Sequence, residues 1–128
     1  DKDEHYSTTT LVLNNNIVLT GYFKGVTENM YAVYSFTDHY GEVKSKRVEY
    51  EDFVVNSSYG HGVDVDELVI ADAAQPVTIT IYNENGMPYS TLVDSMNSYL
   101  RRAINAVGED TIYGKTAKFT KAAYNTLH

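Results

Sequence analysis

The stretch from Tyr31 to Tyr50, YAVYSFTDHYGEVKSKRVEY, constrains the fold more than any other part of the chain. Residues 31–36 are apolar or aromatic on both faces of an extended strand, which is typical of a strand covered on both sides. The next five residues predict a turn, because Gly41 can adopt a positive φ. The return segment, 42–50, carries the charges of an exposed edge strand, at Lys44, Lys46 and Arg47. We therefore predict a β-hairpin whose first strand lies inside a packed sheet.

Short apolar runs on both sides of this hairpin predict further antiparallel strands. The asparagine cluster 14–16 separates the first two runs, and the Asn85-Gly86 turn signal separates the last two. Between them, Asn56–Gly62 is the most loop-like segment. In the run that follows it, Leu68 is assigned to the face opposite Val63 and Val65. The predicted strands outside the organising hairpin are Leu11–Leu13, Ile17–Phe23, Val63–Ile70, Val77–Tyr82 and Met87–Val93.

The hydrophobic period changes from two to 3.6 after residue 94, which predicts helices. A helix over 95–107 places Met96, Tyr99 and Leu100 on one stripe, and a second helix follows from about residue 110. Gly108 between them predicts a helical hairpin that packs against the sheets. The predicted fold is mostly β (α+β): one domain over residues 1–128, with an antiparallel Ig-like β-sandwich of about seven strands (about 7–93) and a C-terminal helical hairpin (94–128).

Composition excludes several classes of function. The 128 residues are 43% hydrophobic and 21% charged, as in ordinary globular proteins, and the absence of cysteine excludes thiol chemistry. Residues 1–100 hold 5 basic and 15 acidic residues, and this acidic body disfavours nucleic acid as a partner. No apolar run is long enough to span a bilayer, so we expect no membrane insertion.

Several motifs occur here in a characteristic order. Gly25, Thr27 and Met30 form G-x-T-x-x-M, and YSFTDHYGEVKSKRVEYEDF follows; VTITIYNENG, DSMNSYLRRA and the ending KFTKAAYNTLH come later. Together they resemble a module that recurs near the C-terminus of large modular secreted proteins of gut Firmicutes. The resemblance covers most of residues 21–128. It implies a non-catalytic accessory β-sandwich with a helical tail, located outside the cell or on its surface, and it assigns no site residues.

Five residues are candidates for ligand binding: His39, Tyr40, Tyr59, His61 and Tyr82. The first four lie in two predicted glycine-containing loops, where ring stacking and imidazole hydrogen bonds could hold a polar ligand such as a sugar. The fifth lies on the outer face of the strand 77–82, beside two threonines. The alternative interpretation is that the histidines are exposed turn residues and that the tyrosines belong to a half-buried sheet.

No catalytic or metal-binding motif stands out from the sequence. The chain lacks Gly-x-Ser-x-Gly, a cysteine nucleophile and His-Glu-x-x-His. Asp64 and Asp66 alternate as calcium ligands often do, but the turn glycine and the distal glutamate of an EF-hand are missing. We therefore predict no catalytic residues, no metal, no cofactor and no enzymatic activity.

Two functions remain open at this point. The first is a structural or interaction module of an extracellular modular bacterial protein, with neighbouring domains of the same chain as partners. The second is a carbohydrate-binding module that uses surface tyrosine and histidine side chains, with a polysaccharide or a surface protein as partner. A small hydrolase is the third hypothesis and the least favoured: carboxylates such as Glu49, Glu51 and Asp52 lie close in sequence, but no nucleophile or acid/base constellation stands out.

Overall fold

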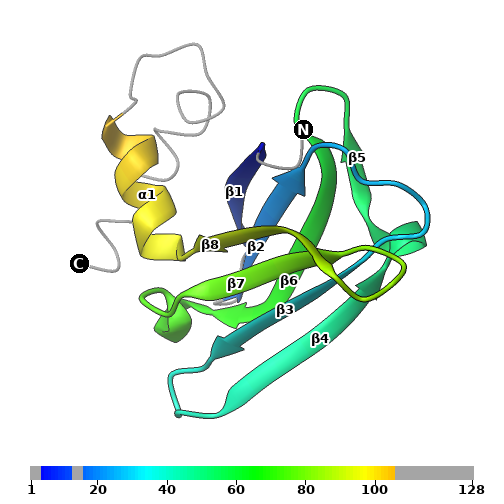
Figure 1. Ribbon diagram of the computed structural model, residues 1–128. Helices are drawn as coiled ribbons and strands as arrows, with labels where there is room; N and C mark the ends of the chain where they lie inside the picture. The colour runs from blue at the N-terminus through cyan, green and yellow to red at the C-terminus, as the bar shows by residue number, and fades with distance from the viewer. Residues whose placement is uncertain (1–3, 13–15, 106–128) are drawn as a thin grey trace.

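A computed structural model describes residues 4–12 and 16–105, which form two antiparallel four-stranded sheets and one helix (Figure 1). The first sheet has the order β1-β2-β6-β5, with bounds His5–Val12, Asn16–Phe23, Gly60–Val69 and Val54–Asn56. The second has the order β4-β3-β7-β8, with bounds Val43–Glu49, Tyr31–Thr37, Val77–Tyr82 and Pro88–Asp94. The short 3-10 helices η1 (Tyr50–Asp52) and η2 (Ile70–Asp72) lie in connections, and α1 spans Met96–Asn105.

The predicted organising hairpin is confirmed. β3 pairs with β4 on one side and β7 on the other, so it lies inside the second sheet, and β4 forms the sheet edge. Ala32, Tyr34 and Phe36 on β3 face the core and are buried. Strand β7 has the predicted bounds and alternates as expected, with Ile79 and Ile81 fully buried between the sheets.

The prediction for β6 assigned Leu68 to the wrong face of the strand. Leu68 is buried together with Val63 and Val65, although simple alternation would turn it outward. The pairing of β6 with β2 shifts by one residue at this point, which inserts a β-bulge and moves the following side chains to the other face. The same region places Glu67 where its carboxylate accepts a hydrogen bond from the buried Tyr34 hydroxyl at 2.7 Å.

Helix α1 begins where the sequence predicts. The Ser95 hydroxyl accepts a hydrogen bond from the Ser98 N–H at 3.2 Å, which is the geometry of an N-cap. Met96, Tyr99 and Leu100 are buried, and the helix lies beside β1 and the end of β8 (Figure 1). At this junction Arg102 and Ser7 donate hydrogen bonds to the buried Asp94 carboxylate.

Two features differ from the prediction or lie beyond the described residues. The described residues form eight strands, because a short β5 precedes β6; only its last residue, Asn56, falls in the segment assigned to a loop. The predicted second helix falls in 106–128, outside the described residues, so the structure shows a single helix and no helical hairpin. In the part of the chain that is described, no helix has the length and apolar character needed to cross a membrane.

Candidate functional site

The five predicted site residues do not form one site. His39 and Tyr40 lie in the turn after β3, whereas His61 contacts Tyr50, which follows β4 at the opposite end of the same hairpin. Tyr59 precedes β6, and Tyr82 ends β7 on the other sheet. The structure therefore separates the two predicted loops by the length of a strand, and each candidate has its own neighbours.

His39 is bound to a buried carboxylate. Its Nδ1 lies 2.7 Å from Asp72 Oδ1, and its backbone N–H donates to the same oxygen at 2.8 Å. Burial tends to raise the pKa of Asp72, but hydrogen bonds from the Val69 N–H and from His39, together with the His39 charge, lower it further than burial raises it. The neighbouring Tyr40 ring is 85% exposed and lies 4.1 Å from the His39 ring. This pair ties the β3–β4 turn to η2.

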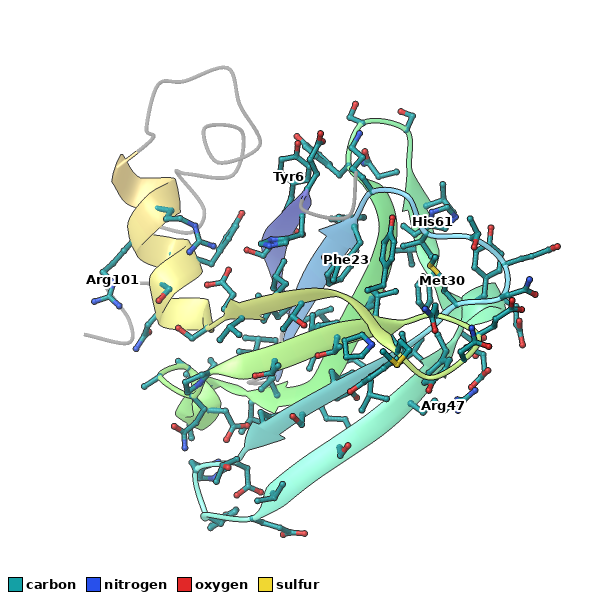
Figure 2. The ribbon with its side chains drawn as sticks, in the orientation of Figure 1. Tyr6, Phe23, Met30, Arg47, His61 and Arg101 are labelled. Atoms are coloured by element: carbon teal, nitrogen blue, oxygen red, sulfur yellow. The ribbon has the colours of Figure 1, made fainter. Side chains whose placement is uncertain are left out.

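The prediction that His61 lies in a loop was wrong, because Gly60 and His61 already pair with β5 as part of β6. The His61 Nε2 lies 3.2 Å from the Tyr50 hydroxyl, and its ring contacts Tyr50 and Phe53. Phe53 is buried, so these contacts extend the core at this end of the sandwich. His61 and Phe23 lie close together in Figure 2 and are paired in the register of β2 and β6.

Tyr82 lies on the outer face of the second sheet. It stacks on Tyr31 with ring centroids 5.3 Å apart and an angle of 18° between the planes. The Arg47 guanidinium covers the Tyr31 ring at 3.7 Å from its centroid and pairs with Glu49. Because Arg47 and Tyr82 already occupy the Tyr31 ring, this cluster offers little aromatic surface to a ligand.

Three other tyrosines meet on the outer face of the first sheet. The rings of Tyr6 and Tyr22 both contact Tyr59, with centroids 5.3 Å and 5.8 Å apart and planes inclined by 57° and 43°. They come from β1, β2 and the segment before β6, respectively. We call the surface formed by Tyr6, Tyr22 and Tyr59 the tyrosine face. Figure 2 shows Tyr6 on β1, far from Arg47 on β4.

Strand register explains why the Tyr22 ring can lie over the backbone of β6. Tyr6, Tyr22, Gly62 and Val54 are directly paired across four strands and form one row. A Cβ atom on Gly62 would lie 2.6 Å from the Tyr22 ring and 2.6 Å from a Val54 methyl group. The missing side chain therefore lets Tyr22 lie over the β6 backbone, as aromatic side chains do beside glycine in sheets.

Three independent contacts hold the loop that carries Tyr59. The Asn56 carboxamide accepts hydrogen bonds from the Ser58 and Tyr59 N–H groups at 2.8 Å and 2.9 Å. The Lys24 ammonium donates to the Ser58 carbonyl at 2.6 Å. Gly60 has a φ of 101°, and its backbone packs on the Phe23 carbonyl with no room for a Cβ. Tyr59 is therefore presented by a fixed loop, which lowers the entropy lost on binding.

The polar groups beside the tyrosine face are acidic. Asp64 accepts a hydrogen bond from the Thr20 hydroxyl at 2.7 Å. Burial, the Asp64 charge and Tyr59 raise the pKa of Tyr22, so its hydroxyl stays protonated at neutral pH. Among the described residues, neither the Tyr22 nor the Tyr59 hydroxyl has a hydrogen-bond partner, and neither is buried. Both hydroxyls are thus free to bond a ligand.

A cleft of about 230 Å3 has Asp64 in its wall. β5 pairs only with 60–62, so β6 is the sheet edge from Val63 onward, and the cleft opens between this edge and β4. Its walls are charged with both signs; they are formed by Lys46, Arg47, Val48, Asp52, Asp64 and Asp66. Within residues 4–12 and 16–105, no three histidine or carboxylate side chains converge in a way that could hold a metal ion.

Two of the three tyrosines on this face are not among the predicted site residues. Tyr22 alternates with the buried Phe23 on β2, and Tyr6 alternates with the buried Ser7 on β1, so each was recognisable as an outward residue once its strand was assigned. Their meeting depends on the pairing of β1, β2 and β6, and no local pattern specifies that pairing. Only Tyr59 was named as a candidate.

Comparison with known proteins gives likeness in structure but none in sequence. No protein-family model matches the sequence, and no curated protein matches it either. Among solved structures, the chain is similar to an endonuclease/exonuclease/phosphatase from Beutenbergia cavernae, with 5% identity and a TM-score of 0.41. The match covers 72% of this chain and 23% of the other, so the chain spans about a quarter of that protein.

This comparison contradicts the prediction that the chain is not an enzyme, because the similar structure is that of an enzyme. We therefore withdraw the prediction. At 5% identity and a TM-score of 0.41 the likeness carries no argument for a nuclease or phosphatase activity in this chain.

Proposed function

We propose that this chain is an interaction module of a larger extracellular bacterial protein and that it binds carbohydrate on the tyrosine face. One observation carries the proposal: Tyr6, Tyr22 and Tyr59 converge from three separate segments on one surface, and three contacts fix the loop of the third. Tyrosine suits sugar binding because its ring covers the C–H face of a pyranose while its hydroxyl bonds to water or ligand.

Geometry favours a glycan over a protein partner. The face combines ring surfaces with the Asp64 carboxylate and with the Tyr22 and Tyr59 hydroxyls, which have no partner among the described residues; this mixture matches the alternating C–H and O–H groups of a sugar. A stable protein interface covers about 800 Å2 on each partner and has an apolar centre. Tyr6 and Val54 are the large apolar side chains exposed along the Tyr6–Val54 row, at 38% and 37%. This is too little for such a centre.

The inclination of the rings points to the shape of the glycan. Neighbouring rings are inclined by 43° and 57°, so the tyrosine face is not a flat platform. A flat crystalline polysaccharide surface would contact one ring at a time. A single soluble chain that twists from one sugar to the next can stack on successive rings, and we propose that such a chain is the ligand.

Affinity electrophoresis of the full chain in gels that contain soluble polysaccharides tests the proposal. We expect at least one polymer to retard the chain. Tyr22→Ala should abolish the retardation, because it removes the ring that lies over Gly62 and contacts Tyr59. Tyr82→Ala is the matched control on the other sheet and should leave it unchanged. Circular dichroism would show that both variants are folded. If no polymer retards the wild-type chain, the proposal is wrong.

The setting of the module is a further part of the proposal. The motif order that resembles modules of secreted Firmicutes proteins supports an extracellular or cell-surface location, with neighbouring domains of the same chain as partners. We also propose the finer features of the fold, namely an Ig-like arrangement of the two sheets and a C-terminal helical hairpin. Backbone NMR chemical shifts of residues 110–127 would test the second helix, and extended shifts there would exclude it.

A further inference from the structure

We infer that Asp64 makes the tyrosine face selective for neutral glycans over glycans that carry carboxylates. This inference rests on the proposed carbohydrate binding and names the chemistry of the ligand. The Asp64 carboxylate lies beside the Tyr22 ring in the strand register, because Asp64 follows Gly62 by two residues on the same side of β6. Its charge contributes to raising the pKa of Tyr22, which places it within electrostatic reach of that ring.

A contact from the neighbouring strand holds Asp64 in place. Thr20 is directly opposite Asp64 in the register, and its buried hydroxyl donates to Oδ1 at 2.7 Å. Among the described residues, Oδ2 has no hydrogen-bond partner, and the Asp64 residue is exposed. One oxygen thus fixes the carboxylate, and the other is available to a ligand.

A carboxylate in this position discriminates between two kinds of sugar. The hydroxyl group of a neutral sugar on the Tyr22 ring can donate to Oδ2, and hydrogen bonds to an ionised acceptor are stronger than neutral ones. A uronic acid in the same place would bring a second carboxylate toward Asp64. Two like charges a few ångströms apart at a solvated surface weaken binding by roughly five- to tenfold.

The other charges near the face do not cancel this effect. Lys24 is a cation near the face, and its ammonium group donates to the neutral Ser58 carbonyl; it keeps its positive charge, which offsets one negative charge near the rings. Lys46 and Arg47 line the cleft beside Asp64, and Asp52 and Asp66 line the same cleft and balance their two charges. On the other side of the face, the Tyr6 hydroxyl lies 3.5 Å from the Glu4 carboxylate. The surroundings of the rings are therefore net acidic.

Matched ligands and matched variants of the full chain test the inference. The ligand pair is the neutral polymer that retards the chain and the same polymer oxidised at C6 to the uronate. The variant pair is Asp64→Asn and Asp66→Asn, which remove the same charge two residues apart. Dissociation constants come from affinity electrophoresis at low salt and at 0.5 M NaCl, where surface charges are screened.

We expect the wild-type chain to bind the oxidised polymer roughly tenfold more weakly than the neutral one, with a smaller difference at high salt. Asp64→Asn should reduce the difference in affinity between the two polymers to about twofold, and Asp66→Asn should keep most of that difference. Equal binding of both polymers by the wild-type chain would overturn the inference, and so would an equal effect of the two variants. The proposed function would survive either result, since it fails only if no polymer retards the chain.

Discussion

Gly60 and Gly62 shape the tyrosine face at the scale of single residues, for different physical reasons. Gly60 has a φ of 101° and lies against the Phe23 carbonyl, so both its backbone conformation and its contact exclude a side chain. Gly62 has no such backbone requirement, and its absent side chain leaves room for the Tyr22 ring. Gly60 thus fixes the loop that carries Tyr59, and Gly62 lets the Tyr22 ring lie close to the sheet.

A substitution pair separates strain from overlap at Gly60. Gly86 also has a positive φ, 78°, but its Cβ would be 3.7 Å from the nearest atom, the Tyr31 hydroxyl. We expect Gly86→Ala to lower the free energy of unfolding by about 1–2 kcal/mol, the cost of the left-handed backbone alone. Gly60→Ala should lower it by more than about 3 kcal/mol, because the new methyl group would overlap backbone atoms.

Urea unfolding of both variants measures the difference. Equal losses would show that the Phe23 carbonyl moves away at no cost, and they would remove one of the three contacts that hold the Tyr59 loop.

Asp72 makes stability depend on pH. Its folded-state pKa is lowered, so it stabilises the fold above its unfolded pKa, near 3.8, and this stabilisation is lost as pH falls through the folded value. We expect Asp72→Asn to lower the free energy of unfolding at pH 7 by about 1–3 kcal/mol, because the bonds to His39 and Val69 are weakened.

Urea unfolding at pH 7 and below pH 3 tests this prediction. The variant and the wild-type chain should be closest in stability at the lower pH. A constant difference at both values would show that the Asp72 charge does not contribute.

At the scale of elements, β7 is one of the two inner strands of the second sheet, since it pairs with β3 and β8. Its two faces have different environments. Ile79 is fully buried between the sheets, whereas the adjacent Thr80 is half-buried on the outer face.

Ile79→Ala and Thr80→Ala therefore form a matched pair on one strand. The first should lower the free energy of unfolding by about 2–5 kcal/mol, because it leaves a cavity in the core. The second should change it by less than about 1 kcal/mol. Chemical denaturation measures both values. A similar loss at the two positions would contradict the assignment of the outer face.

The sequence predicted the elements of the second sheet and failed on features that depend on pairing. β3, β4 and β7 carry local patterns, such as alternation and edge charges, and each was placed within a residue or two. The bulge in β6 has no signal of its own, and it reversed the assignment of Leu68. The tyrosine face was missed for the same reason, because Tyr6 and Tyr59 are 53 positions apart in the chain and meet only through strand register.

At the scale of the whole molecule, the sandwich carries an aromatic cluster on each outer surface. On the second sheet, Arg47 and Tyr82 cover the Tyr31 ring, and this cluster stabilises the sheet. On the first sheet, the Tyr22 and Tyr59 hydroxyls have no hydrogen-bond partner among the described residues, and the loop that carries Tyr59 is fixed. A ligand that binds on the first sheet of the folded chain should therefore raise the free energy of unfolding of the whole domain.

The retarding polymer should stabilise the full chain against heat. When the concentration of free binding sites on the polymer is 100 times the dissociation constant, binding adds about 2.7 kcal/mol to the free energy of unfolding. Differential scanning calorimetry should show a rise in Tm of several degrees for the wild-type chain and for Tyr82→Ala, and none for Tyr22→Ala. A rise in all three would place the binding surface elsewhere.

Gly62 has a consequence for how surfaces of this kind can be recognised. Gly62 lets the Tyr22 ring lie close to the sheet but contributes no side-chain atom to the tyrosine face. A search for clustered side-chain groups would therefore not find Gly62. A search in other two-sheet proteins would look for a glycine on an inner strand. This glycine would be paired with an aromatic residue on one neighbouring strand and with an aliphatic residue on the other. Tyr22, Gly62 and Val54 supply the template for that search.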